Sequence, residues 1–355
     1  MTILFESTTL ANLKLKNRVV MSPLTRCRAL SNTPNQLMAK YYEQRSCAGL
    51  IISEGTSPSP NGLGYARIPG LFNHSHVEGW KLTTQAVHKH SSRIFVQLMH
   101  CGRVGNPLNM PEGARLLAPS AIAAPGTMWT DSQGLQEFTA PREMSENEIK
   151  IAIGEYAHAC KLAVEAGFDG VELHGANGYL IDQFLNTASN HRKDAWGGSV
   201  KHRAHFALEV VKASVAAIGH SKVGIRLSPY GVFNGMSPDA EMDELYVHLA
   251  RELSALRIAY IHLVDHSSMG APKVSEELVS NMRKNFRGTL ILSGGYDVAR
   301  AEADLTREAG DLIAFGRSFI SNPNLVEKLK SGIELTPADS ETFYTADEKG
   351  YTDYP

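Results

Sequence analysis

The stretch Asp169-Gly-Val-Glu-Leu-His-Gly-Ala-Asn-Gly-Tyr-Leu-Ile-Asp-Gln-Phe-Leu185 decides the fold. It begins with a short apolar run of strand character and continues into three polar side chains, His174, Asn177 and Tyr179. Two glycines between these side chains interrupt any regular helix or strand. A buried parallel strand that ends in a glycine turn with convergent polar groups is typical of an active site, although such groups are also common as structural elements.

The composition is that of a globular protein. The 355 residues are 43% hydrophobic and 20% charged, with a formal net charge of −2. A near-neutral charge without a dense run of lysine and arginine argues against binding to nucleic acid or to a membrane surface. No apolar run is long enough to span a bilayer, and the N-terminus lacks signal-peptide features. The four cysteines form no Cys-x-x-Cys pair, so we expect a reduced, cytoplasmic protein without a disulfide framework.

Strand-like runs alternate with helical segments along the chain. Most of these runs are continuous Val/Ile/Leu stretches, as expected for strands buried on both faces. Eight strand–helix units predict a closed parallel α/β barrel of the (β/α)8 or TIM type, because right-handed crossovers place each strand beside its predecessor. The predicted strands are residues 18–23, 49–54, 93–98, 169–174, 223–228, 260–265, 289–294 and 311–316.

Helix signals lie between these strands. Residues 145–148 form a capping box, so a helix is predicted to begin there and to end at a glycine before the next strand. Ser237 followed by Pro238 predicts the start of another helix, with a buried stripe from Met242 to Leu256. Further helices are expected at residues 36–47, 78–89, 203–217, 275–285, 298–309 and 324–330.

The chain is longer than a minimal barrel, which needs about 250 residues. Much of the surplus is the Pro- and Gly-rich segment 102–141, which we expect to form a cap inserted after the third strand. Residues 5–17 are expected to plug the opposite mouth, and residues 343–355 form a C-terminal extension. Because no linker is visible, residues 1–355 are predicted to be one domain.

Candidate site residues follow from the barrel, because the C-terminal ends of its strands meet at one face. Glycines at the seventh and eighth strand ends, beside an arginine, favour a phosphate-bearing ligand over simple turns. The candidates in chain order are Pro23, Leu24, Thr25, Glu54, Gly55, Gln97, His100, His174, Asn177, Tyr179, Arg226, Tyr230, Gly294, Gly295, Gly316 and Arg317.

Arg226 at the end of a buried strand must be paired or must serve a ligand. Glu54 and Asp265 are the only carboxylates that we identify among the neighbouring strand ends, so a ligand role is favoured.

A metal site is the main alternative to a cofactor site. His100, His174, His262 and His266 are possible zinc or iron ligands of a barrel hydrolase. However, no strand carries a His-x-His pair, and no strand-end carboxylate is clearly placed to complete such a site.

Together and in order, the motifs of this chain resemble the old yellow enzyme family of flavin-dependent ene-reductases, from the N-terminus to Pro355. Met99 stands where many relatives have a tryptophan, and residues 344–350 replace a glycine-rich run. The motifs are Met21-Ser-Pro-Leu-Thr-Arg26, Ala48-Gly-Leu-Ile-Ile-Ser-Glu54, Gln97-Leu-Met-His-Cys-Gly-Arg103, the opening stretch from His174, residues 190–199, Ala314-Phe-Gly-Arg317 and Gly350-Tyr-Thr-Asp-Tyr-Pro355.

The resemblance implies a non-covalently bound FMN reduced by NADPH or NADH. A fixed cation at Arg226 would lie by the flavin N1/O2 edge and favour the reduced form. Pro23, Leu24, Thr25, Gly55 and Gln97 would contact the isoalloxazine ring, and Gly294, Gly295, Gly316 and Arg317 would hold the phosphate.

The resemblance also implies the reduction of activated C=C bonds in enones, maleimides and nitroalkenes, with nitrate esters as a further class. His174 and Asn177 would hold the activating oxygen, and Tyr179 would protonate the α-carbon after hydride transfer from N5. The pocket walls would include Tyr65, Met99, Tyr230 and Tyr344.

Two alternatives stay open, a barrel metal hydrolase and a flavin-binding protein without turnover. The expected partners are small molecules, and the expected state is a monomer or homodimer.

Overall fold

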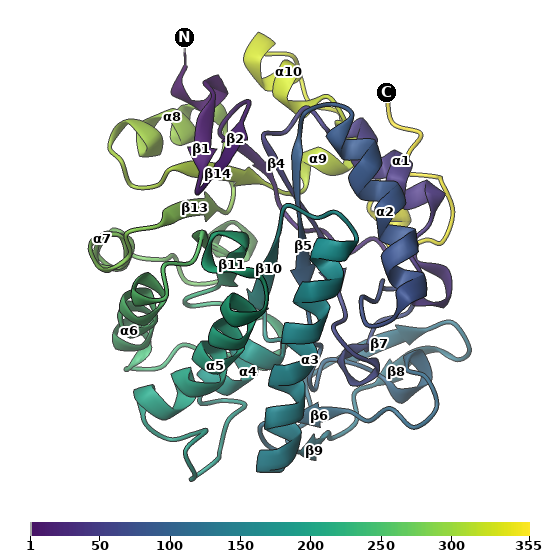
Figure 1. The fold of residues 1–355 in the computed structure, drawn as a ribbon, viewed down its shortest axis with the longest axis vertical. Helices are drawn as coiled ribbons and strands as arrows, with labels where there is room; N and C mark the ends of the chain where they lie inside the picture. The colour runs from purple at the N-terminus through teal and green to yellow at the C-terminus, as the bar shows by residue number, and fades with distance from the viewer. Residues whose placement is uncertain (1) are drawn as a thin grey trace.

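The computed structural model describes residues 2–355, which form a closed barrel of eight parallel strands surrounded by helices (Figure 1). The predicted (β/α)8 barrel is confirmed, and the last strand pairs with the first to close it. The barrel strands are β3 (Val19–Met21), β4 (Leu50–Thr56), β5 (Arg93–Leu98), β10 (Gly170–Gly175), β11 (Val223–Leu227), β12 (Tyr260–Val264), β13 (Thr289–Ser293) and β14 (Leu312–Phe315).

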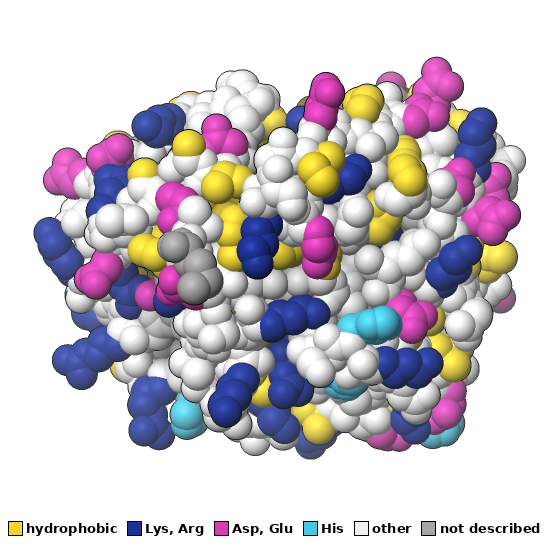
Figure 2. Space-filling view, turned by 90° about the horizontal axis from the view of Figure 1, so that it is seen from above, with side chains coloured by type: hydrophobic (Ala, Val, Ile, Leu, Met, Phe, Trp, Pro, Cys, Tyr) yellow, Lys and Arg dark blue, Asp and Glu magenta, His cyan; other side chains and the backbone are white. Residues whose placement is uncertain are grey.

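An antiparallel hairpin closes the N-terminal end of the barrel. It consists of β1 (Thr8–Leu10) and β2 (Leu13–Leu15), and its buried Leu10 and Leu15 belong to one apolar cluster with Phe95 and Tyr260 of the barrel interior. This hairpin occupies the place of the predicted plug. The end of the molecule that carries it shows basic and acidic side chains interspersed with isolated apolar ones (Figure 2).

Helices cover the outside of the barrel and pack on its outward-facing apolar side chains. α3 begins with the predicted capping box, in which Ser145 and Glu148 satisfy each other's backbone N–H groups. No described helix is long and apolar enough to cross a membrane. The predicted helices correspond to α1 (Gln36–Gln44), α2 (His74–His88), α3 (Glu146–Glu165), α5 (Val200–Ile218), α6 (Met242–Ala255), α7 (Glu276–Asn285), α8 (Val298–Thr306) and α10 (Leu325–Ser331).

The predicted helix start at Ser237 and Pro238 is wrong. α6 begins five residues later at Met242, because the intervening backbone is held by tertiary hydrogen bonds. Asn186 Nδ2 donates to the Ser237 carbonyl at 2.9 Å, and the Thr187 hydroxyl donates to Asp239. Two short helices, α4 (Leu180–Leu185) and α9 (Ser318–Ser321), were not predicted.

The segment between β5 and α3 carries four short strands: β6 (Leu117–Ala118), β7 (Thr127–Thr130), β8 (Gly134–Glu137) and β9 (Arg142–Glu143). β7 and β8 form a hairpin, and β6 pairs with β9. Val104, Ala124 and Met128 of this segment pack together against Tyr179. The segment therefore lies against the polar stretch that follows β10.

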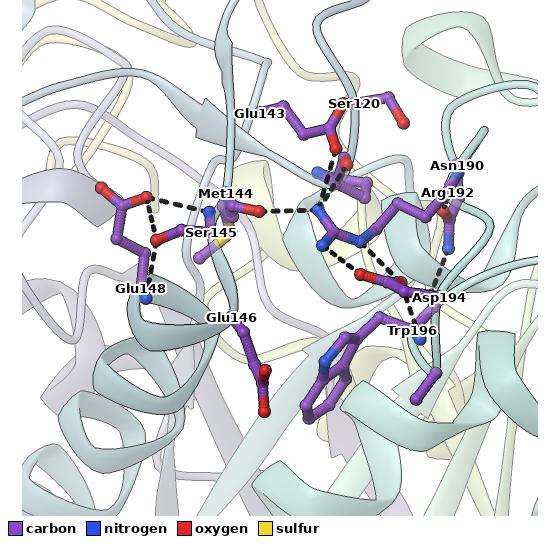
Figure 3. Close-up of polar contacts among 12 residues, drawn as sticks. Ser120, Glu143, Met144, Ser145, Glu146, Glu148, Asn190, Arg192, Asp194 and Trp196 are labelled. Atoms are coloured by element: carbon purple, nitrogen blue, oxygen red, sulfur yellow. Dashed lines mark hydrogen bonds and ion pairs between the residues drawn. The ribbon is translucent and has the colours of Figure 1, made fainter.

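A polar brace fastens this segment to the loop that follows α4 (Figure 3). Arg192 donates to the carbonyls of Pro119 and Met144 and pairs with Asp194. Asn190 Nδ2 donates to the Trp196 carbonyl at 2.8 Å. The motif at residues 190–199 thus has a structural role outside the cavity.

Candidate active site

A cavity of about 620 Å³ lies at the C-terminal end of the barrel strands. The residues predicted from strand ends converge on it, because parallel strands deliver their C-terminal residues to one face. The predicted residues that line the cavity are Pro23, Leu24, Thr25, Tyr65, Gln97, Met99, His174, Asn177, Tyr179, Arg226, Gly294, Gly295, Gly316, Arg317 and Tyr344.

Four candidate site residues, Glu54, Gly55, His100 and Tyr230, do not line the cavity. A Cβ atom at Gly55 would lie 2.5 Å from Met99 Sδ, so the glycine makes room for the Met99 side chain. Tyr230 has a left-handed backbone with φ of 59°, and its hydroxyl donates to Asp243 of α6. The predicted places of Gly55 and Tyr230 in the cavity wall are corrected accordingly.

His174 presents a hydrogen-bond donor in a fixed tautomer. Its Nδ1 accepts from the Ala176 backbone N–H at 3.3 Å, so Nε2 carries the proton of the neutral ring. Burial, and then the Arg226 charge, hold the His174 pKa well below its usual value, so the ring is neutral. His174 and Arg226 face each other directly in the register of β10 and β11.

Asn177 projects from a left-handed turn with φ of 60°, a conformation that asparagine tolerates better than most residues. Its backbone is fixed, because its N–H donates to Ser228 Oγ at 3.0 Å and its carbonyl accepts from Asn234 at 2.8 Å. The side-chain Oδ1 is buried without a partner among residues 2–355. The amide is therefore available to a ligand.

Tyr179 is the N-cap residue of α4. It lies between His174 and Asn177 on one side and the segment that joins β5 to α3 on the other. Its hydroxyl is 2.9 Å from the Tyr65 hydroxyl, and its ring packs edge-on against His174 with centroids 4.8 Å apart. Burial raises the pKa values of both phenols above their usual range, so both hydroxyls keep their protons at neutral pH.

Arg226 is buried and its Nε has no partner in the described chain. Burial lowers the pKa of Arg226, and the Glu172 carboxylate acts against this effect. Glu172 is thus a further carboxylate near Arg226, beyond the strand-end residues Glu54 and Asp265 that the sequence analysis considered. Glu172 lies within β10, two residues before His174, so the alternation of side chains along a strand places both in the barrel interior.

The glycine turns after β13 and β14 form a cradle in the cavity wall. Gly294 and Gly295 have φ values of 123° and 63°, and a Cβ atom at Gly294 would lie 2.0 Å from the Asp265 carbonyl. At Gly316 a Cβ atom would make ordinary van der Waals contact, with Ser22 Cβ 3.7 Å away. Backbone N–H groups with an adjacent arginine, Arg317, suit a phosphate.

Further residues line the cavity that the sequence analysis did not predict as part of the flavin or substrate site: Ser22, Arg26, Phe233, Asn234, Val264, Asp265, His266, Ser268, Met269, Ser293, Tyr296, Ala314, Phe315, Ser318, Ile320 and Phe343. The strand-end rule, applied to β12, would have assigned Asp265, His266, Ser268 and Met269 to this site.

No cluster of three or more potential metal ligands occurs among residues 2–355. Instead, His262 contacts Glu172 and Ser293, and His100 Nδ1 accepts from the Gly102 N–H. In contrast, three features of the cavity fit FMN: an Arg226 Nε and an Asn177 Oδ1 that are buried without partners within residues 2–355, and the glycine turns after β13 and β14.

Comparisons with known proteins agree with this geometry. Residues 3–336 match the model of the NADH:flavin oxidoreductase / NADH oxidase family. A probable flavin mononucleotide-dependent alkene reductase of Leishmania infantum is 38% identical, covering 96% of this chain and 94% of the relative. The structure of morphinone reductase superposes with a TM-score of 0.96 at 41% identity, covering 100% of this chain and 96% of the other.

An old yellow enzyme homologue from Zymomonas mobilis superposes with a TM-score of 0.94 at 39% identity, covering 99% of each chain. The protein is thus an FMN-dependent oxidoreductase that takes electrons from a reduced nicotinamide. It belongs to the NADH:flavin oxidoreductase / NADH oxidase family, with the old yellow enzymes. This membership decides against the metal-dependent hydrolase.

Proposed function

We propose that the protein reduces activated C=C bonds, such as those of enones, maleimides and nitroalkenes, with NADPH or NADH as electron source. The observation that carries the proposal is the grouping of His174, Asn177 and Tyr179 on one wall of the cavity, beside the unpartnered Arg226. The names of the alkene reductase and morphinone reductase support it.

The residues that would hold FMN are those of the strand ends. Pro23, Leu24, Thr25 and Gln97 would contact the ring, and Arg226 would lie by its N1/O2 edge. Gly294, Gly295, Gly316 and Arg317 would bind the phosphate. The chemistry that FMN supplies when bound is hydride transfer from N5 to the β-carbon of the alkene.

His174 and Asn177 would donate hydrogen bonds to the carbonyl or nitro oxygen of the substrate. Negative charge builds on this oxygen as the hydride arrives, so fixed donors stabilise the transition state more than the ground state. His174 is suited to this role, because its Nδ1 is occupied and its Nε2–H is free to donate.

Tyr179 would give its proton to the α-carbon. Its hydroxyl is held by Tyr65 at 2.9 Å, which orients it, and its raised pKa keeps it protonated until the carbanion-like carbon accepts the proton. Tyr65, Met99 and Tyr344 would form the walls that contact the rest of the substrate.

Two half-reactions test the proposal. NADPH should bleach the bound FMN anaerobically, and 2-cyclohexenone should restore the yellow colour. Tyr179→Phe should leave the bleaching nearly intact and slow the recovery by about 10²–10⁴-fold. Tyr246→Phe, buried on α6 outside the cavity, is the matched control. A flavin that NADPH bleaches but no alkene reoxidises would indicate a flavin-binding protein without turnover.

The wider organisation is part of the same proposal. Residues 1–355 would form one FMN-binding domain, with 102–141 as a cap and 343–355 as an extension over the cavity. A cytoplasmic location is supported by four free cysteines, three of them buried. A monomer or homodimer stays our expectation.

A further inference from the structure

A hydrogen-bonded chain of buried side chains crosses the barrel directly beneath the cavity. Gln97 Nε2 donates to Glu172 Oε1 at 2.8 Å, and His262 Nδ1 lies 2.9 Å from Glu172 Oε2. His262 Nε2 then lies 3.0 Å from the Ser293 hydroxyl. The chain thus joins β5, β10, β12 and β13, and its two ends, Gln97 and Ser293, line the cavity.

The protonation states along this chain follow from chemistry. Burial lowers the pKa of His262 in spite of the Glu172 carboxylate, so the ring is neutral and has one N–H. A carboxylate only accepts, so that N–H is at Nδ1, and Nε2 accepts from the Ser293 hydroxyl. For the same reason Gln97 turns its amide nitrogen to Glu172, and its carbonyl oxygen remains available for a ligand N–H.

The chain also places one negative charge below the cavity. The side chains of Glu172 and His262 are fully buried, and Glu172 acts on the nearby Arg226. No ion pair within 4.0 Å joins Arg226 to a carboxylate in residues 2–355, so the cation is balanced from a distance rather than neutralised by contact. In this low-dielectric interior both charges act strongly on any ligand ring between the strand ends.

We propose that Glu172 and His262 are positioning residues for the flavin. Glu172 fixes the Gln97 amide and offsets the Arg226 charge, and His262 holds the carboxylate in place. Arg226 stabilises the reduced flavin, which carries more negative charge, and Glu172 opposes this effect. Arg226 and Glu172 together therefore set the ratio of the affinities for reduced and oxidised FMN, and with it the reduction potential of the bound FMN. This inference rests on FMN binding and not on the proposed alkene reduction.

The reduction potential of bound FMN tests the inference. Glu172→Gln removes the charge but keeps the length and polarity of the side chain. It should make the potential more positive, with a change of about tenfold or more in the ratio of affinities for reduced and oxidised FMN. Glu209→Gln on the outer face of α5 removes a remote, partly exposed charge and should leave the ratio unchanged.

His262→Gln separates the effect of the Glu172 charge from the effect of the hydrogen-bonded chain. It interrupts the chain at the same depth but keeps the Glu172 carboxylate, so the potential should move far less than in Glu172→Gln. An equal shift in both variants, or no shift in Glu172→Gln beyond that of Glu209→Gln, would overturn the inference. Either result can be obtained whether or not the enzyme reduces enones.

A double variant covers the case in which Glu172→Gln does not fold because Arg226 is left buried without the balancing Glu172 charge. The potential is then compared between Arg226→Gln and the double variant Arg226→Gln/Glu172→Gln. The double variant should have the more positive potential, since only the opposing carboxylate differs. Identical potentials would contradict the inference.

Discussion

Two regions of the molecule bury arginines in opposite ways. Arg28, near the C-terminal segment, donates to the carbonyls of Thr342, Phe343 and Lys349 and to the Thr345 hydroxyl. Arg226, in the cavity wall, is also buried, but its Nε has no partner among the residues described. A cation is costly to bury unless it is paired, so the first arginine stabilises the fold and the second is kept for a ligand.

Other buried arginines of this protein also have several hydrogen-bond partners, as Arg28 does. Arg45 donates to the carbonyls of Tyr41, Phe319 and Ile320, and Arg26 donates to those of Phe343 and Gly350. Together these arginines fasten the C-terminal segment against the barrel, next to the cavity residue Tyr344. The number of hydrogen-bond partners therefore separates the structural arginines Arg26, Arg28 and Arg45 from Arg226.

The largest expected effect is the loss of the Arg28 contacts. Arg28→Met leaves several buried carbonyls without donors, so the free energy of unfolding should fall by about 3–5 kcal/mol. Urea unfolding of the FMN-free protein measures it. A loss below about 1 kcal/mol would break the comparison, because the paired arginine would then contribute no more than a surface charge.

The next effect concerns the polar groups that face the cavity beside Arg226. The double variant His174→Ala/Asn177→Ala should weaken the binding of phenols by about 100-fold, because a phenolate oxygen mimics the charge that these donors are placed to stabilise. Titration of the flavin absorbance with p-chlorophenol measures the Kd. Unchanged affinity would assign both side chains to the structural class instead.

Glu54 tests the comparison at one of the buried arginines that have hydrogen-bond partners. It accepts from the Arg26 N–H and lies 3.2 Å from the Tyr42 hydroxyl, yet burial raises its pKa to about 7. The folded state therefore holds this proton more tightly than the unfolded state, and the contribution of Glu54 to stability falls as pH rises from about 4.5 to about 7.

Glu54→Gln should remove this dependence. At pH 8 the variant should be more stable than the wild type by about 1–3 kcal/mol, and at pH 4 the advantage should vanish. Chemical unfolding at both pH values gives the difference. An equal gap at the two pH values would show that Glu54 is already ionised at acidic pH in the folded state.

The smallest effect is expected at the partly exposed ion pair between Arg67 and Asp131. Arg67 contacts Asp131 of the β7–β8 hairpin and donates to the carbonyls of Cys27 and Tyr344. Because Asp131 is half exposed, Asp131→Asn should change the free energy of unfolding by less than about 1 kcal/mol. Thermal unfolding with and without 0.5 M NaCl checks this. A loss of unfolding free energy above about 2 kcal/mol that persists in salt would show that this ion pair stabilises the fold as the buried arginines do.

The sequence was sufficient for the barrel and for most of the cavity wall. Continuous apolar runs mark strands buried on both faces, and the strand-end rule then gathers Thr25, His174 and Arg226 at one face. The strand-end rule did not select Glu172, because this residue lies inside a strand rather than at its end. The two-residue alternation with His174 nevertheless places its side chain in the barrel interior.

The remaining errors come from tertiary contacts that local patterns do not contain. The helix signal at Ser237 is real, but the hydrogen bond from Asn186, which is far away in sequence, holds that backbone extended. Tyr230 follows a barrel strand, but its left-handed turn sends it to Asp243. Whether Gly55 faces a ligand or a side chain depended on the position of Met99.

One measurement tests the central distinction between the two arginines most directly: thermal unfolding of FMN-free Arg226→Met, paired with its affinity for FMN. The account predicts a smaller fall in Tm than in Arg28→Met, because Arg226 gives up no hydrogen bond within residues 2–355 and only the distant balance with Glu172 is lost. It also predicts at least about tenfold weaker FMN binding. A Tm that falls as far as in Arg28→Met, with FMN affinity unchanged, would contradict it.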